Sequence, residues 1–234
     1  MFIKKIKIVC VVIFMLGVGL GIVLWGKKNE SLLFDTQELY CICYGENLNG
    51  DMLVNTQKQI ERLGGAGVVM NDKIAGETVV VFAYTSFSDA EKILGVIKKQ
   101  LPSAFLVERY TKKIGGRIKN TIENNEGLNN VITKLYKYSK SCFDMWEDYE
   151  NGIVLASSMY RFMIETNYEL NNMLSLIDDT KLREIYTSIK VVTVSIDTYL
   201  NRYITGSDAH LYLKKAVVSL LIEKMNIYDM ISTF

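Results

Sequence analysis

The segments LYCICY at residues 39–44 and TVVVFAY at residues 78–84 decide the fold that the sequence predicts. Both are short and rich in β-branched and aromatic residues, which favour strands. Polar residues and glycine separate a third segment, VVM at residues 68–70, from residues 78–84, so we expect a hairpin there. The run AFLV at residues 104–107 completes a set of four predicted strands.

Two helical patterns lie between these strands. In residues 51–63 apolar side chains recur at helical spacing, and Gly64-Gly65 follows as a helix terminator. The second helix begins at a Ser88 cap, with Glu91 at the capping-box position. The order βαββαβ is the split arrangement of ferredoxin-like domains, so we predict such a domain over residues 36–116.

The sequence over residues 118–234 has the pattern of a helical bundle. Four runs carry apolar residues at spacings of three and four. Brief polar breaks separate the runs at Asn151-Gly152, Asp178-Asp179-Thr180 and Thr205-Gly206-Ser207. Because short loops join neighbouring helices that run in opposite directions, we predict an antiparallel α-helical bundle.

Residues 8–25 form a continuous uncharged and mostly apolar run. At about 1.5 Å per residue it spans roughly 27 Å, close to the hydrocarbon thickness of a membrane. The run ends in a poor cleavage site and is flanked by lysines, so we expect an uncleaved transmembrane helix over residues 8–26. Greater positive charge before the run predicts a cytoplasmic tail at residues 1–7. The chain is then a single-pass protein of the cell membrane, with its bulk extracytoplasmic.

The predicted fold class is therefore α+β: an N-terminal transmembrane helix, a ferredoxin-like domain and an antiparallel α-helical bundle. Composition also limits the function. The chain has 27 Lys plus Arg against 26 Asp plus Glu, so it lacks the basic excess of a nucleic-acid binder. His210 is the only histidine and no metal-ligand spacing occurs. We expect no nucleic-acid partner, no metal, no cofactor and no enzymatic activity.

Some residues that could carry chemistry have a simpler structural interpretation. His210 lies just after a predicted Ser207 cap and is interpreted as a surface or cap-region residue. In an extended strand, the separation between Cys41 and Cys43 is near the upper limit for a disulfide bond. Both are interpreted as small buried hydrophobic residues. Four acidic residues near the end of one run are interpreted as a solvated helix end: Asp144, Glu147, Asp148 and Glu150. No catalytic residue is predicted.

The first predicted domain resembles the SPOR domains, small βαββαβ modules that bacteria place outside the membrane. Their opening motif, Tyr-x-Val-Gln-x-Gly, is similar to Tyr40-Cys41-Ile42-Cys43-Tyr44-Gly45 here, with Cys43 in the Gln position. Their second motif, an Arg-Val-x-Val-Gly-x-Phe-like strand before an Ala-Glu-rich helix, is similar to the segment that ends in Thr85-Ser86-Phe87-Ser88-Asp89-Ala90-Glu91. Val81 stands at the family's Arg and Thr85 at its Gly. The resemblance covers about 75 of the 234 residues.

The resemblance implies a membrane-anchored adaptor of the bacterial cell envelope. Such a protein binds septal peptidoglycan, or a septal protein partner, during division or sporulation. Two alternatives involve no glycan binding: a purely protein-binding scaffold, and an accessory subunit of an envelope enzyme complex. Gly17 and Gly21 in the apolar run have the spacing that lets two helices approach closely, which allows a homo-oligomer.

SPOR domains bind glycan on the open face of the sheet. Strand alternation predicts that one face of this sheet is entirely apolar and lined by Cys41, Cys43, Val79, Val81 and Ala83. Because a sugar-binding face offers polar groups, we expect another part of the protein, or a partner, to cover this predicted contact surface. Polar candidates for glycan contacts remain at the strand ends and adjoining loops: Asn47, Asn49, Glu108 and Arg109.

Overall fold

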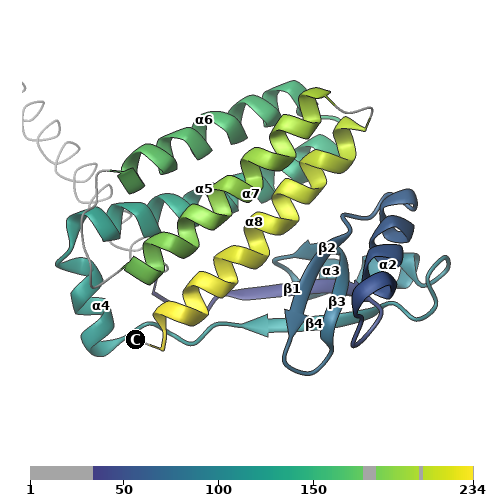
Figure 1. Ribbon diagram of the computed structural model, residues 1–234, viewed down its shortest axis with the longest axis horizontal. Helices are drawn as coiled ribbons and strands as arrows, with labels where there is room; N and C mark the ends of the chain where they lie inside the picture. Colours follow the sequence, from purple (N-terminus) through teal and green to yellow (C-terminus); the bar gives the residue numbers. More distant parts are fainter. Residues whose placement is uncertain (1–33, 176–182, 206–207, 234) are drawn as a thin grey trace, which may run out of the picture. The chain divides into compact units, whose positions relative to one another are not determined.

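The computed structural model describes residues 34–175, 183–205 and 208–233. Its elements are β1 (Glu38–Tyr44), α2 (Gly50–Arg62), β2 (Val68–Asp72), β3 (Gly76–Tyr84), α3 (Phe87–Ile97), β4 (Phe105–Tyr110), α4 (Gly116–Glu123), α5 (Glu126–Glu150), α6 (Ala156–Ser175), α7 (Arg183–Thr205) and α8 (Ala209–Ile231). Residues Thr36–Phe234 form one compact unit, in which the strands and the long helices lie side by side (Figure 1).

The four strands form an antiparallel sheet in the order β2-β3-β1-β4, so β1 and β3 are central. In the first half of β1, Tyr40 pairs with Tyr84 and Ile42 with Phe82. A bulge between Ile42 and Cys43 then shifts the register, so that Cys43 pairs with Val80. Because a bulge adds one residue to a strand, the alternation of side chains between the two faces changes at this point of β3.

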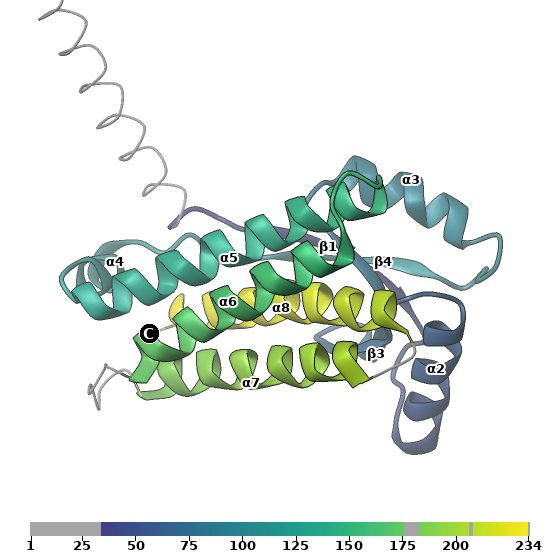
Figure 2. The same cartoon turned by 90° about the horizontal axis from the view of Figure 1, so that it is seen from above.

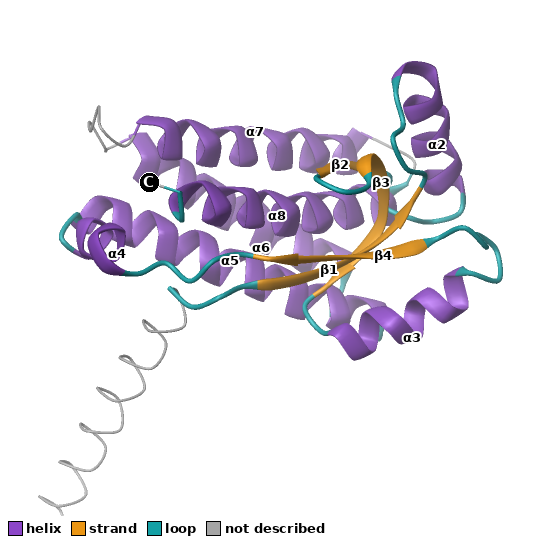
Figure 3. Ribbon diagram, turned by 90° about the horizontal axis from the view of Figure 1, so that it is seen from below, coloured by secondary structure: helices purple, strands orange, loops and turns teal. Residues whose placement is uncertain are grey.

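Helices α2 and α3 pack on one face of the sheet, and Figure 3 shows them flanking the strands. The apolar core there is formed by Ile42 and Ile60 with residues of β3 and the α3–β4 loop. α2 ends at Arg62 and is followed by Gly64 with φ +83°, a backbone conformation that favours glycine. The N-cap of α3 is Ser86, whose hydroxyl accepts the Asp89 N–H at 3.4 Å, and not the predicted Ser88.

Helix α8 covers the opposite face of the sheet. It contacts β1, β2 and β3, and its Asp229 forms an ion pair at 3.2 Å with Arg109 of β4. Helices α5, α6 and α7 also contact α8, and Figure 2 shows α8 running between α7 and the α5–α6 pair. α8 is therefore buried on nearly every side, which explains why apolar residues occur all around it, including Val218, Leu220 and Ile222.

The helices α5 to α8 pack through apolar side chains and a few buried hydrogen bonds. Tyr138 of α5 donates its hydroxyl to the Met163 carbonyl of α6 at 3.0 Å. Asn167 of α6 donates to the Thr193 carbonyl of α7 at 2.9 Å. Burying these polar groups with partners fixes the relative positions of the three helices.

The predicted fold class is wrong. Within residues 34–175, 183–205 and 208–233 no helix is long and apolar enough to cross a membrane. The run predicted to do so, residues 8–25, lies outside the described residues, as do the predicted tail at residues 1–7 and the Gly17–Gly21 pair. Nothing in the described residues supports a single-pass protein of the cell membrane.

The sheet is also not a simple ferredoxin-like module. The chain is mostly helical, and α8 lies on the face that such a module leaves open. The physical reason lies in the apolar face itself: strand residues that are apolar on both sides need a cover on both sides.

Candidate functional site

A groove of 710 Å³ lies beside β3, between α3 and the end of α5. We call it the α3–α5 groove. Its inner wall carries three aromatic residues, Phe82, Tyr84 and Trp146. Its rim carries four carboxylates, from α3 and α5: Asp89, Glu147, Asp148 and Glu150. Cavities of this volume are in the range that holds small molecules or short peptide segments.

The wall of the groove is built where α5 meets β3. Trp146 packs on Phe82 with ring centroids 5.6 Å apart, and Phe143 packs on Tyr84 at 6.4 Å. Trp146 is only 3% exposed, so its ring faces the interior. Ile93 and Ile97 of α3 add partly buried apolar side chains. The aromatic contacts therefore hold the end of α5, with its carboxylates, against the sheet.

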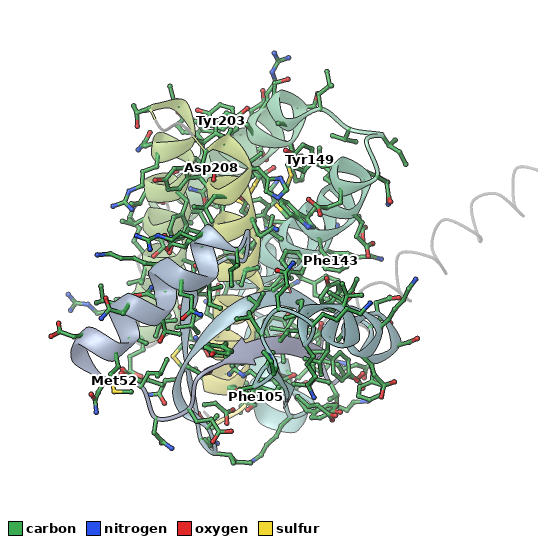
Figure 4. All side chains as sticks on the ribbon, turned by 90° about the vertical axis from the view of Figure 1, so that its right-hand side faces the viewer. Met52, Phe105, Phe143, Tyr149, Tyr203 and Asp208 are labelled. Carbon is green, nitrogen blue, oxygen red and sulfur yellow. The ribbon has the colours of Figure 1, made fainter. Side chains whose placement is uncertain are left out.

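His210 joins the start of α8 to the end of α5. Its Nδ1 lies 3.2 Å from the Tyr149 hydroxyl, and its Nε2 lies 3.5 Å from Glu150 Oε1. Figure 4 shows Tyr149 and Asp208 at the same end of the helices. Burial, followed by the nearby Lys214 ammonium, lowers the pKa of His210. The N-cap of α8 is Asp208, which accepts the Leu211 N–H at 3.0 Å, and not the predicted Ser207.

Lys214 closes one end of the groove. Its Nζ donates to the Gly64 carbonyl at 2.7 Å and lies 5.4 Å from the Trp146 ring centroid. Burial lowers the pKa of this amine. The glycine turn after α2 thus supplies a carbonyl that holds Lys214 at this end of the groove.

The rim of the groove is negatively charged. Asp89, Glu147 and Asp148 form no ion pair within the described part of the chain, and two lysines, Lys92 of α3 and Lys214, also line the groove. The pKa of Glu147 is raised, first by burial and then by the neighbouring Asp144 and Asp89 carboxylates. A positively charged ligand would relieve this repulsion.

The five predicted residues of the sheet-face contact surface are all buried, but they lie on two faces. Cys41, Cys43 and Ala83 lie on the face that α8 covers, and burial raises the pKa of Cys41 to about 12, which keeps its thiol protonated. Val79 and Val81 lie instead in the core formed with α2 and α3. The β-bulge causes this departure from strict alternation of side chains. The sequence alone does not reveal the bulge.

The four predicted glycan contacts do not form one site. Asn47 and Asn49 are exposed in the loop after β1. Glu108 and Arg109 lie beside the first half of β1, where they pair with Tyr40 and Leu39. The Arg109 side chain is 13% exposed and bound to Asp229, and Glu108 accepts the Tyr110 hydroxyl at 2.6 Å. These residues are thus divided between two ends of the sheet.

Sequence reasoning missed the α3–α5 groove. It treated Glu147, Asp148 and Glu150 as a solvated helix end, and His210 as an isolated surface or cap-region residue. No sequence motif joins α5 to the start of α8, about 60 residues later. The only signal was the concentration of carboxylates beside Trp146 and Tyr149.

Comparisons with protein-family models, with curated proteins and with solved structures found no match for this chain. The resemblance to SPOR domains therefore stays a prediction, and the groove has to be interpreted from its own geometry.

Proposed function

We propose that the protein is a non-enzymatic scaffold that binds a short basic segment of a partner protein in the α3–α5 groove. The observation that carries this proposal is a set of three carboxylates, Asp89, Glu147 and Asp148, which have no ion-pair partner among the described residues and surround a partly apolar groove. Lys or Arg side chains of the segment pair with the rim, while its apolar side chains contact Ile93 and Ile97. This is the protein-binding alternative among the roles that the sequence predicts.

The geometry favours a peptide over a glycan. The sheet face through which SPOR domains bind sugar is occupied by α8 in this chain. In the groove, the indole of Trp146 is buried and offers no open surface for a sugar ring to stack on. Binding to septal peptidoglycan, or to a septal partner during division or sporulation, stays a prediction.

Charge also distinguishes the kind of protein segment that fits. Charged groups on the two sides of an interface are arranged with opposite signs, because like charges placed together cost several kcal/mol. The rim has four carboxylates, and Lys214 is already bound to the Gly64 carbonyl. An acidic segment is thus excluded, and a basic one gains both attraction and a faster encounter.

The test uses fluorescence anisotropy with the full-length chain and two labelled peptides of eight residues. One peptide alternates Lys with Leu, and the other alternates Glu with Leu. We expect saturable binding of the Lys peptide only. Glu147→Lys should weaken it at least tenfold, which is about 1.4 kcal/mol. Glu165→Lys is the matched control, because Glu165 is exposed on α6 away from the groove.

Equal loss of binding in both variants would show attraction to overall charge and would overturn the proposal. Sedimentation with purified peptidoglycan sacculi is run in parallel. If the chain sediments with the sacculi and does not bind the Lys peptide, the glycan-binding role is correct and the scaffold role is wrong.

A further inference from the structure

Two glutamates and two tyrosines share one face of the sheet where β1 begins and β4 ends. Across these strands Glu38 pairs with Tyr110, and Tyr40 pairs with Glu108. Because side chains two positions apart in a strand, and those of cross-strand partners, lie on the same face, all four project from one face. Phe87, the first residue of α3, contacts Tyr40 there. We call these five residues the Tyr–Glu patch.

The three aromatic rings of the patch meet edge to face. The Tyr40 ring centroid lies 5.6 Å from that of Phe87 and 6.2 Å from that of Tyr110, with interplanar angles of 67° and 90°. Tyr40 is buried, whereas Phe87 is 43% exposed and Tyr110 is 51% exposed. Tyr40 therefore supports two rings that solvent can reach, and the face of such a ring attracts cations.

The two carboxylates of the patch give it a negative charge. Tyr40 donates its hydroxyl to Glu38 at 2.8 Å, and Tyr110 donates to Glu108 at 2.6 Å. These hydrogen bonds raise the pKa of both phenols, so the tyrosines stay neutral. Glu38 and Glu108 are exposed, and neither forms an ion pair within the part of the chain that the structure describes. Each carboxylate can therefore accept further hydrogen bonds from a cation.

The backbone at this corner of the sheet is held in place beyond the strands. The Gln37 N–H donates to Thr111 Oγ1 at 2.9 Å, and the Thr111 N–H donates to the Gln37 carbonyl at 3.0 Å. Thr111 is 2% exposed, so water does not compete for these bonds. Because the strand ends are already joined, a ligand that binds the patch orders little additional chain.

We propose that the Tyr–Glu patch is a second docking site, which binds an arginine side chain of a partner protein. The guanidinium plane stacks on the exposed Tyr110 ring, and its N–H groups donate to the carboxylates of Glu38 and Glu108. None of the five residues of the patch lines the α3–α5 groove, so this inference does not depend on the proposed function.

Arginine fits the patch better than other ligands that bind aromatic residues. A lysine ammonium is a compact, strongly hydrated charge and has no plane that stacks on a ring. A sugar offers hydroxyls that both donate and accept, whereas the phenol protons of Tyr40 and Tyr110 are already donated to carboxylates. A cation, unlike a sugar, also balances the charge of the two carboxylates.

The test measures, by fluorescence anisotropy, how two labelled peptides of eight residues bind the full-length chain. One peptide alternates Arg with Ser and the other alternates Lys with Ser, so both carry the same charge and neither has an apolar side chain. We expect saturable binding of the Arg peptide, at least about threefold tighter than that of the Lys peptide.

Variants locate the bound peptide. Tyr110→Ala removes the ring and Glu108→Gln removes one charge, and each should weaken binding of the Arg peptide about fivefold, which is about 1 kcal/mol. Tyr110→Phe keeps the ring and should bind within about twofold of the unchanged chain. Tyr168→Ala and Glu165→Gln are the matched controls at exposed positions of α6, and both should leave binding unchanged.

Equal affinity for the two peptides would show attraction to charge alone and would overturn the inference. Loss of Arg-peptide binding in Glu147→Lys, but not in Tyr110→Ala, would place the peptide in the α3–α5 groove; the proposed function would then stand and the second site would not exist. A chitin tetrasaccharide is tested in parallel. If it binds and Tyr110→Ala abolishes that binding, while the Arg peptide does not bind, the patch is a glycan site and the arginine assignment is wrong.

Discussion

Replacing Ala83 by aspartate tests whether α8 covers the sheet. Ala83 is 0% exposed, pairs with Cys41 at the centre of the sheet and lies on the face that α8 occupies. A carboxylate placed there has no room for water, and the cation on this face, Arg109, is already paired with Asp229, so the folded chain has to keep the new carboxyl group protonated. The unfolded chain ionises the same group with a pKa near 3.9.

The cost follows from this difference in protonation. Holding the group neutral at pH 7 costs about 4 kcal/mol, and at pH 5 it costs about 1.5 kcal/mol. Because the folded-state pKa is raised, the folded state binds the extra proton, and the loss of stability grows as the pH rises above about 4. The larger side chain adds roughly 1–3 kcal/mol at every pH.

The assay is urea unfolding of Ala83→Asp and of the unchanged chain at pH 5 and pH 7. Val194→Asp serves as control, because Val194 is 53% exposed on α7 and should change the free energy of unfolding by about 0.5 kcal/mol or less. If Ala83→Asp costs less than about 1 kcal/mol at pH 7, or the same at both pH values, the sheet face is open to water and the reasoning fails.

Two further predictions concern single contacts. Tyr138→Phe removes the hydrogen bond to the Met163 carbonyl and should lower the free energy of unfolding by about 1–3 kcal/mol. Tyr168→Phe, at an exposed position of α6, should leave the free energy of unfolding unchanged. Urea unfolding of both variants measures the difference. Because the pKa of His210 is lowered in the folded chain, the unfolded chain takes up a proton more readily, and the melting midpoint should fall as the pH drops below about 6.5. His210→Gln should reduce that fall. An unchanged pH dependence in the variant would contradict the lowered pKa of His210.

Local patterns predicted the order of strands and helices through β4, because alternation, glycine turns and helical spacing act over a few residues. They failed at β3, where the bulge depends on how β1 and β3 pair and moves Val79 and Val81 to the other face. They also failed for α8. The 3-4 spacing predicts one apolar stripe for this helix, but Ala216, Val218 and Ile222 lie on its other sides and indicate a helix that is buried all round.

The candidate site could not be predicted from the sequence, for a different reason. Tyr149 and Glu150 meet His210 only after three helices have folded, and Lys214 meets the Gly64 carbonyl 150 residues earlier in the chain. Such contacts depend on tertiary packing, so no residue spacing in the sequence predicts them.

The central position of α8 has a consequence for biosynthesis. The strands are complete once Tyr110 has emerged from the ribosome, but the helix that covers them begins at Ala209, about 100 residues later. At roughly 5–20 residues per second, the interval is about 5–20 seconds. During that time Cys41, Cys43 and Ala83 have no cover from α8, and an apolar sheet face of this kind invites aggregation. The nascent chain should therefore depend on a chaperone that shields the sheet until synthesis reaches α8.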